Sequence, residues 1–395
     1  MAVAAVVALA LLCSKHVKAV AVPVTNPRCI DLTLPVSATS QNAIYDIPRV
    51  GSTIDAVSYE LDLDTRTSPK DRLLRNITVS GTYDIAAKLC VPKDGKKKDL
   101  LHIATHGGVF DGRYWDAEID PKQYSYVENV LDAGYSILTY DRLGNGGSDK
   151  PDPYKVNQLP MAVQILRGIT KMARDGELMQ YASSGSKAPS APKFNKIIHV
   201  GHSLGSITTT GLITTYGNES DGAIITGFIP TFSFPAPTIG FDLHLASEYN
   251  PELFGDYPNG YFISSTQSAI QANFFSSRRN HTAGIGGFTP ELLQYGDSIK
   301  SPFGVAELIS AGQLNLGLAP DFKGPIQWML AEYDWLVCGG DCRGTADMDV
   351  LDTLYPAVAG KEVYIQTGTG HGLPLHRNAN TGFKVSLDFL DRNGL

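Results

Sequence analysis

The chain is poor in charge and in cysteine, and it has a single long apolar run. Only 18% of its 395 residues are charged and the formal net charge is −7, so no excess of positive charge is available to bind nucleic acid. The apolar run at residues 2–13 is too short to span a bilayer. No internal repeat is visible. With 43% hydrophobic residues, the composition predicts a globular protein with a large core, most simply one domain with an insertion.

The apolar run at the N-terminus has the character of a secretory signal. Ala, Val and Leu make up nearly all of residues 2–13, and a polar segment then leads to Ala19-Val20-Ala21, which resembles a cleavage site. No Lys or Arg precedes the run. We expect residues 1–21 to be a signal peptide and the mature protein to be secreted without stable membrane anchoring. An uncleaved anchor and an apolar tail are the alternatives.

The few cysteines agree with secretion. Of the five, Cys13 lies inside the expected signal, and the remaining even set allows three disulfide connectivities. Because two of these cysteines are close in sequence, we favour the pairs Cys338–Cys342 and Cys29–Cys90, with free buried thiols as the alternative. Three glycosylation sequons are compatible with the same route: Asn76, Asn218 and Asn280.

A glycine-rich stretch at residues 196–206 carries the strongest functional signal. Ile197, Ile198 and Val200 form a short apolar run typical of a buried strand, and residues 206–215 have helical character. A sharp turn between them would push Ser203 out at its tip in a strained conformation, while Gly201 and Gly205 let strand and helix cross closely. A Gly-x-Ser-x-Gly pattern alone is weak in a chain with 39 glycines, but the flanking elements favour a nucleophilic serine.

A serine hydroxyl needs a base to take its proton and a carboxylate to orient that base. His371 lies between two glycines beyond the last expected strand, where His376 is the other histidine. Asp334 directly follows a late apolar strand, whereas Glu332 is closer to the strand end and Asp341 lies inside the expected disulfide loop. We therefore predict His371 as general base and Asp334 as orienting acid.

Two backbone N–H groups are expected to stabilise a developing oxyanion. One belongs to Leu204, at the start of the helix that follows Ser203. The other should come from the loop His106-Gly107-Gly108-Val109, where glycine lets the backbone approach a substrate. We predict Gly108, with Val109 close behind, and a plain strand-to-helix turn as the alternative.

Strands and helices alternate along most of the chain, which predicts a parallel sheet with helices on both faces and an active site at the carboxyl ends of the strands. Residues 53–63 and 77–91 are expected to be paired antiparallel strands at the sheet edge, and residues 183–192 a flexible surface loop. The other expected strands are residues 100–105, 135–140, 197–200, 223–230, 326–331 and 362–366. The expected helices are residues 120–133, 158–174, 206–215 and 381–391.

The pattern changes between residues 231 and 323, where proline, phenylalanine and tyrosine are frequent and no strand is evident. We interpret this segment as a cap inserted between a core of residues 22–230 and 324–395. The aromatic residues between Phe232 and Phe275, with Tyr114 and Trp115, are expected to form an apolar wall over Ser203. The alternative is that these rings only hold the cap to the sheet.

The order Ser203, Asp334, His371, with His106-Gly107-Gly108 upstream and Asp141-Arg142-x-Gly-x-Gly-x-Ser148 between, resembles the α/β-hydrolase superfamily. The resemblance covers about residues 58–395 and is similar in style to secreted fungal members. It implies a mostly parallel eight-stranded sheet with helices on both faces and a cap between the sixth and seventh strands. A serine in the turn argues against the epoxide-hydrolase and haloalkane-dehalogenase branches, which place an aspartate there.

The expected function is a serine hydrolase that cleaves an ester, lactone or amide of a bulky apolar or aromatic small molecule, without a cofactor or metal. Some related biosynthetic enzymes instead catalyse condensation or cyclisation, and a non-catalytic binding protein on the same fold is a further alternative. The loop Gly144-Asn145-Gly146-Gly147 follows a strand, as the glycine-rich dinucleotide-binding motif of oxidoreductases does. Asp149 stands where that motif has its third glycine, which argues against an oxidoreductase.

Overall fold

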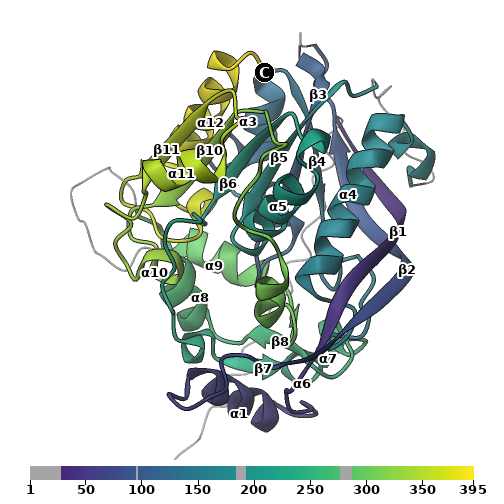
Figure 1. Ribbon diagram of the computed structural model, residues 1–395, viewed down its shortest axis with the longest axis vertical. Coiled ribbons are helices and arrows are strands. Elements are labelled where there is room, and N and C mark those ends of the chain that lie inside the picture. The colour runs from purple at the N-terminus through teal and green to yellow at the C-terminus, as the bar shows by residue number, and fades with distance from the viewer. Residues whose placement is uncertain (1–27, 95–96, 184–192, 276–286) are drawn as a thin grey trace, which may run out of the picture.

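An eight-stranded sheet forms the centre of the protein in the computed structural model, which describes residues 28–94, 97–183, 193–275 and 287–395 (Figure 1). The strand order is β1-β2-β4-β3-β5-β6-β10-β11. β1 and β2 are antiparallel to their neighbours, and the strands from β4 to β11 are parallel. The strands are β1 (Cys29–Tyr45), β2 (Leu73–Cys90), β3 (Lys97–Thr105), β4 (Tyr135–Tyr140), β5 (Lys196–His202), β6 (Gly222–Thr226), β10 (Ile326–Ala331) and β11 (Lys361–Gln366).

Helices cover both faces of the sheet, as predicted (Figure 1). The central strands are apolar on both sides: Ile197 packs with α4, whereas its neighbour Ile198 packs with α3 and α12 on the opposite face. Such continuous apolar strands are typical of a parallel sheet buried between two layers. The helices are α2 (Pro121–Tyr124), α3 (Tyr126–Asp132), α4 (Leu159–Asp175), α5 (Leu204–Thr215), α11 (Met348–Leu354) and α12 (Ala379–Arg392).

The predicted edge strand at residues 53–63 is wrong, because this segment forms helix α1 (Thr53–Asp64). Ser52 caps the helix by accepting the N–H of Asp55, and the buried residues Ala56, Tyr59 and Glu60 recur with helical spacing on one side. The antiparallel partner of β2 is instead β1, whose inner face alternates as Ile30, Leu32, Leu34, Val36 and Ala38.

The segment interpreted above as a cap (residues 231–323, called the cap below) contains a small antiparallel sheet, so the expectation that it has no strand is also wrong. Its strands are β7 (Leu243–Leu245), β8 (Tyr261–Ser264) and β9 (Phe303–Gly304), and its helices are α6 (Ala246–Tyr249), α7 (Pro251–Phe254), α8 (Gln267–Phe274) and α9 (Pro290–Ser298). Strands this short carry too few residues to show alternation. Helix α1 packs against β7 and lies with the cap at the lower end of Figure 1.

Both predicted disulfides, Cys29–Cys90 and Cys338–Cys342, are present. Of the sequons, Asn76 and Asn218 are exposed, while Asn280, the expected signal and most of the 183–192 loop lie outside the described residues. Within the described ranges, no helix combines the length and the apolar character needed to cross a membrane.

The carboxyl group of Glu60 is buried between α1 and the cap, and this makes stability depend on pH. Burial, together with Asp242 and Asp64, raises its pKa from 4.5 to about 7. The folded chain therefore holds this proton more tightly than the unfolded chain does, and stability falls as pH rises from 4.5 to about 7.

Replacing Glu60 by glutamine should remove this pH dependence. We expect Glu60→Gln to raise the melting temperature at pH 8 by about 2–5 °C and to leave it unchanged near pH 4.5, because glutamine stays neutral throughout. Thermal unfolding of both proteins at the two pH values measures the effect, with the exposed Glu118→Gln as control. An equal shift at both pH values would contradict a role for the charge.

Candidate active site

Ser203 lies in a strained turn between β5 and α5, as the sequence predicts. Its backbone has φ 52° and ψ −118°, a conformation that residues with a side chain rarely adopt. Its N–H donates to the carbonyl of Thr226 at 2.9 Å. A Cβ atom on Gly201 would lie 2.6 Å from the carbonyl oxygen of Gly205, and one on Gly205 would overlap the backbone of Thr105. Both glycines are therefore required for the close crossing that holds the turn.

The loop after β3 approaches this turn from the neighbouring strand. A Cβ atom on Gly107 would lie 3.1 Å from Cβ of Ser203, and one on Gly108 would lie 2.9 Å from the side chain of Leu204. In the described part of the chain, the N–H groups of Gly108 and Leu204 have no hydrogen-bond acceptor. Both predicted donors are thus brought together beside Ser203 and remain available to a substrate oxygen.

The conformation of this loop is held by its neighbours. Val109 has φ 72°, which is unfavourable for a β-branched residue, and its carbonyl accepts the N–H of Ser301 from the cap at 2.6 Å. The ring of His106 accepts the N–H of Arg142 at 2.9 Å and donates to the carbonyl of Gly107 at 2.8 Å. Burial and the nearby Arg142 hold the pKa of His106 well below its usual value, so the ring stays neutral and can make both bonds.

His371 and Asp334 meet in the interior at the ends of β11 and β10. Nδ1 of His371 lies 2.6 Å from Oδ2 of Asp334, and the two side chains are 1% and 0% exposed. The other carboxylate oxygen accepts the N–H of Val337 at 2.9 Å, which makes Asp334 the cap of the short helix α10 (Trp335–Cys338). Among the described residues, Nε2 of His371 has no hydrogen-bond partner, and the residue lines the same cavity as Ser203.

The alternative acids and the alternative base have other partners. Glu332 accepts the N–H of Gly368 at 2.8 Å, and Asp341 forms an ion pair with Arg343 at 2.6 Å. His376 is fully buried and bonds to the loop that carries His371. The structure therefore brings Asp334, and neither of the other acids, to His371.

His202, next to the predicted nucleophile, lies behind the cavity. Its ring stacks on Tyr114 at 4.6 Å and lies 4.7 Å from the ring of His371. Its Nδ1 lies 3.1 Å from the hydroxyl of Thr226, which itself donates to Gly201. Burial, followed by His371 and His106, holds the pKa of His202 well below its usual value. The ring is therefore neutral and packs against the base without entering the cavity.

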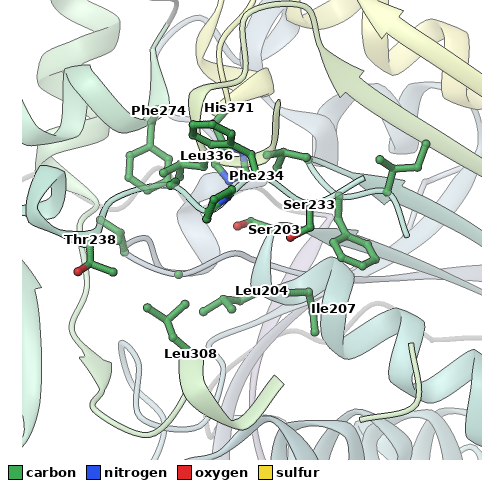
Figure 2. Close-up of a pocket in the computed structure, with 18 of the residues that line it drawn as sticks. Ser203, Leu204, Ile207, Ser233, Phe234, Thr238, Phe274, Leu308, Leu336 and His371 are labelled. Atoms are coloured by element: carbon green, nitrogen blue, oxygen red, sulfur yellow. The ribbon is translucent and has the colours of Figure 1, made fainter. Parts of the chain in front are cut away.

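A cavity of about 560 Å³ opens over Ser203 and His371 (Figure 2). Its polar side chains are Ser203, Ser233, Thr238 and His371. Apolar side chains from the cap and from the loops of the sheet make up most of the remaining wall: Val109, Leu204, Ile207, Phe228, Ile229, Phe232, Phe234, Phe241, Phe274, Phe303, Leu308, Leu316, Leu336 and Val337. A cavity of this size and character suits an apolar small molecule.

The predicted aromatic wall is only partly correct. Four of the expected rings line the cavity: Phe232, Phe234, Phe241 and Phe274. Tyr114 and Trp115 do not, because they are buried beneath it, with Tyr114 against His202. Tyr261 is a buried cap ring outside the cavity whose hydroxyl donates to the carbonyl of Pro151 in the core, so it holds the cap to the core as the alternative interpretation proposed. Leu336 and Val337 were missed because they follow Asp334 in a loop that carries no pattern.

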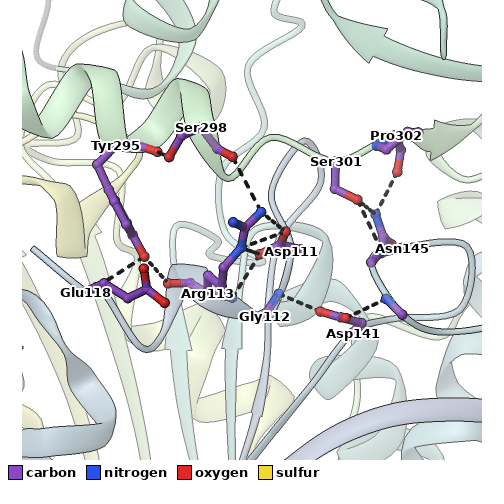
Figure 3. A network of polar contacts seen from close by, with 12 residues as sticks. Asp111, Gly112, Arg113, Glu118, Asp141, Asn145, Tyr295, Ser298, Ser301 and Pro302 are labelled. Atoms are coloured by element: carbon purple, nitrogen blue, oxygen red, sulfur yellow. Dashed lines mark hydrogen bonds and ion pairs between the residues drawn. The ribbon is translucent and has the colours of Figure 1, made fainter. Parts of the chain in front are cut away.

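The glycine-rich loop at residues 141–149 is closed by its own contacts (Figure 3). Asp141 accepts the N–H groups of Gly112 and Gly147 at 2.9 and 2.8 Å, and Asn145 donates to Ser301 and to the carbonyl of Pro302 in the cap. Every N–H from Gly144 to Gly147 has an acceptor within the protein. The loop therefore joins the sheet to the cap and has no free N–H groups for a dinucleotide phosphate.

A second set of contacts holds helix α9 to the segment that follows the loop after β3 (Figure 3). Arg113 forms an ion pair with Asp111 at 2.6 Å, and its carbonyl accepts the hydroxyl of Tyr295 at 3.1 Å. Nearby, Arg142 and Glu307 form an ion pair at 3.0 Å with both side chains 2% exposed. The cap is thus joined to both loops that border the cavity.

The chain forms an eight-stranded, mostly parallel sheet that carries a serine turn, a buried histidine–aspartate pair and a cap. This combination is that of a hydrolase-type α/β protein. The chain belongs to the alpha/beta hydrolase family, whose model matches residues 101–381. Comparison with curated protein sequences gives no match.

Several solved structures are similar to this chain. An enol-lactonase from Burkholderia xenovorans LB400 is 14% identical, with a TM-score of 0.51, over 78% of this chain and 97% of its own. An esterase from Thermogutta terrifontis is also 14% identical, with a TM-score of 0.49, over 79% of this chain and 95% of its own. An epoxide hydrolase from Mycobacterium thermoresistibile is 16% identical, with a TM-score of 0.48, over 78% of this chain and 95% of its own. Of these three, only the enol-lactonase has a TM-score above 0.5, and at 14% identity its similarity shows the fold alone.

The Cys338–Cys342 disulfide should affect catalysis more than stability. It links Cys338, the last residue of the helix that Asp334 caps and that carries the wall residues Leu336 and Val337, to Cys342. The N–H of Cys342 donates to the carbonyl of Glu332 at 2.9 Å. Closing so short a loop contributes at most about 2 kcal/mol. We expect Cys338→Ser/Cys342→Ser to lower kcat for a model ester about tenfold or more, because the carboxylate loses its alignment, with a small fall in melting temperature.

The control is Cys29→Ser/Cys90→Ser, which opens a disulfide spanning 61 positions. We expect this variant to lose more stability while its turnover per folded molecule stays unchanged. A collapse of melting temperature without loss of turnover in the Cys338→Ser/Cys342→Ser variant would make that disulfide a stabilising link with no role in aligning Asp334.

Proposed function

We propose that the protein is a serine hydrolase that forms an acyl-enzyme on Ser203, with His371 as general base and Asp334 as orienting acid. The observation that carries this proposal is the placement of Ser203, in its strained turn, in one cavity with His371, whose Nδ1 is bonded to the buried Asp334 at 2.6 Å. A carboxylate in this position fixes the ring so that Nε2 faces the serine and can accept its proton.

The proposed reaction proceeds in two stages. Oγ of Ser203 attacks the ester carbonyl carbon while its proton passes to Nε2 of His371, and the resulting oxyanion accepts the N–H groups of Gly108 and Leu204. His371 then protonates the leaving alkoxide, and an alcohol is released. In the second stage His371 takes a proton from water, the hydroxide attacks the acyl carbon, and the acid leaves as Ser203 regains its proton.

The proposed substrate is an ester, or a lactone or amide, of a bulky apolar or aromatic small molecule. The cavity supports this because phenylalanine, leucine, isoleucine and valine side chains form most of its wall around Ser203. Phe234 also packs on Trp335 at 5.5 Å, which joins the cap to the loop of the proposed acid. Burial of an apolar acyl or alcohol group against these side chains would supply the binding energy.

We also propose that the protein is secreted after removal of residues 1–21. Two disulfides support this, because such bonds persist in oxidising compartments and are rare in reducing ones. The exposed sequon residues Asn76 and Asn218 are placed where a glycan could be attached.

Removal of the Ser203 hydroxyl should abolish turnover without unfolding the protein. We expect Ser203→Ala to lower kcat for a model ester by about 10⁴-fold or more and to lose labelling by a fluorophosphonate probe, while the melting temperature changes little. Ser37→Ala, on an exposed strand, is the matched control and should keep both. Near-normal turnover by Ser203→Ala would rule out the proposed nucleophile, and a protein that neither turns over esters nor reacts with the probe would favour a binding function.

Acyl-chain preference tests the proposed substrate class. We expect kcat/KM to rise from acetyl to medium-chain or aromatic esters, because more apolar surface is buried in the cavity. Leu308→Trp, which fills part of the cavity, should lower kcat/KM for the bulky esters more than for acetyl esters. Leu318→Trp is the control, because Leu318 is an exposed leucine outside the cavity. Equal kcat/KM values across the series would contradict an apolar specificity.

A further inference from the structure

His376 bonds to both residues that flank His371. Its ring is fully buried in the segment between the short turn Leu373–Leu375 and helix α12. Nε2 of the ring accepts the N–H of Gly370 at 3.0 Å, and Nδ1 lies 2.9 Å from the carbonyl oxygen of Gly372. The His376 side chain therefore links the backbone just before His371 to the backbone just after it.

These partners determine the protonation state of the ring. The N–H of Gly370 can only donate, so Nε2 must be unprotonated, and the carbonyl of Gly372 can only accept, so Nδ1 must carry the proton. A neutral imidazole has this combination of one donor and one acceptor, and a charged ring has no acceptor. Burial lowers the pKa of His376 to about 4, which keeps the ring neutral at ordinary pH.

The surroundings of the ring are apolar. Phe275 and Phe288 lie with their ring centroids 5.5 and 6.3 Å from that of His376. A hydrogen bond in such a place is costly to leave unmade, because no water replaces the missing partner. The two bonds should therefore be kept throughout the catalytic cycle.

Other contacts hold the remainder of the loop. Glu332 accepts the N–H of Gly368, Thr369 accepts the N–H of Tyr333 at 2.8 Å, and the N–H of Gly372 donates to Phe274 at 2.7 Å. Each of these fixes one point of the chain. Glycine on both sides of His371 gives the backbone wide conformational freedom, and the ring of His376 is the side chain that restrains both glycines together.

We propose that His376 is a positioning residue for the general base: its neutral imidazole joins Gly370 to Gly372 and so holds the His371 ring in line with both Asp334 and Ser203. The inference rests on the proposed role of His371. A base displaced by about 1 Å loses on the order of 100-fold in rate, and this contact acts on the backbone within one residue of the base.

A graded series of substitutions at position 376 tests the proposal. Glutamine offers a donor and an acceptor with a reach close to that of imidazole, asparagine is too short to bridge both glycines, and phenylalanine keeps a ring without any hydrogen bond. We expect kcat within about threefold of wild type for His376→Gln, about tenfold lower for His376→Asn and about 100-fold lower for His376→Phe, with KM within about twofold throughout.

His199 provides the matched control. It is also a fully buried histidine, with its two ring nitrogens 2.8 and 2.9 Å from the hydroxyls of Ser220 and Thr170, and burial lowers its pKa to about 3. We expect His199→Phe to lower the melting temperature as His376→Phe does, but to keep kcat per folded molecule. Equal kcat for the folded position-376 variants overturns the proposal, and if His376→Phe does not fold, the comparison of His376→Gln with His376→Asn decides it.

A spectroscopic measurement separates this inference from the proposed function. The proton between Nδ1 of His371 and Asp334 should give a low-field NMR signal whether or not the enzyme turns over an ester. We expect the signal to shift or broaden in His376→Phe and to stay unchanged in His199→Phe. An unchanged signal in His376→Phe overturns the positioning role, whereas a changed signal in a protein without any Ser203-dependent turnover would retain that role and reject the proposed hydrolase.

Discussion

The buried hydrogen bond between His371 and Asp334 is the contact on which the geometry of the site depends. It joins the loops that follow two adjacent parallel strands, β10 and β11, and both side chains are almost completely removed from solvent. A buried carboxylate must be well bonded to persist, and Asp334 also caps α10, whose last residue, Cys338, is joined by a disulfide to Cys342. The loop of His371 is bonded to Glu332 and His376. The His371–Asp334 hydrogen bond therefore fixes the loops after β10 and β11 relative to each other.

Neutral histidines act as connectors around this pair. His106 joins the loop after β3 to the loop after β4, and His376 joins the two glycines beside His371. In both places burial lowers the pKa, so the ring supplies one donor and one acceptor to backbone groups that water cannot reach. His371 differs because it lines the cavity and its Nε2 has no hydrogen-bond partner among the described residues. Three histidines of one site thus have different roles, set by what each ring contacts.

The cap also restrains the loops of the sheet that border the cavity. Ser301 and Pro302 bond to the loops that follow β3 and β4, and Glu307 forms a buried ion pair with Arg142. The same segment that supplies Phe303 and Leu308 to the cavity wall therefore restrains the strained Val109 beside the proposed oxyanion donor. The cavity wall and the loop of the proposed oxyanion donor therefore depend on one set of contacts between cap and sheet.

By itself, the sequence determined the features that local patterns encode: the alternation of apolar strands and helices, the serine turn between Gly201 and Gly205, the histidine and acid after later strands, and a disulfide between cysteines four residues apart. The tertiary structure decided the rest. It made residues 53–64 a helix whose buried side faces the cap, formed short cap strands from residues far apart in the chain, and selected Leu336 and Val337 for the cavity wall. It also gave His106 and His376 their partners. These outcomes depend on which distant segments meet, and long-range contacts leave no periodic signal in the sequence.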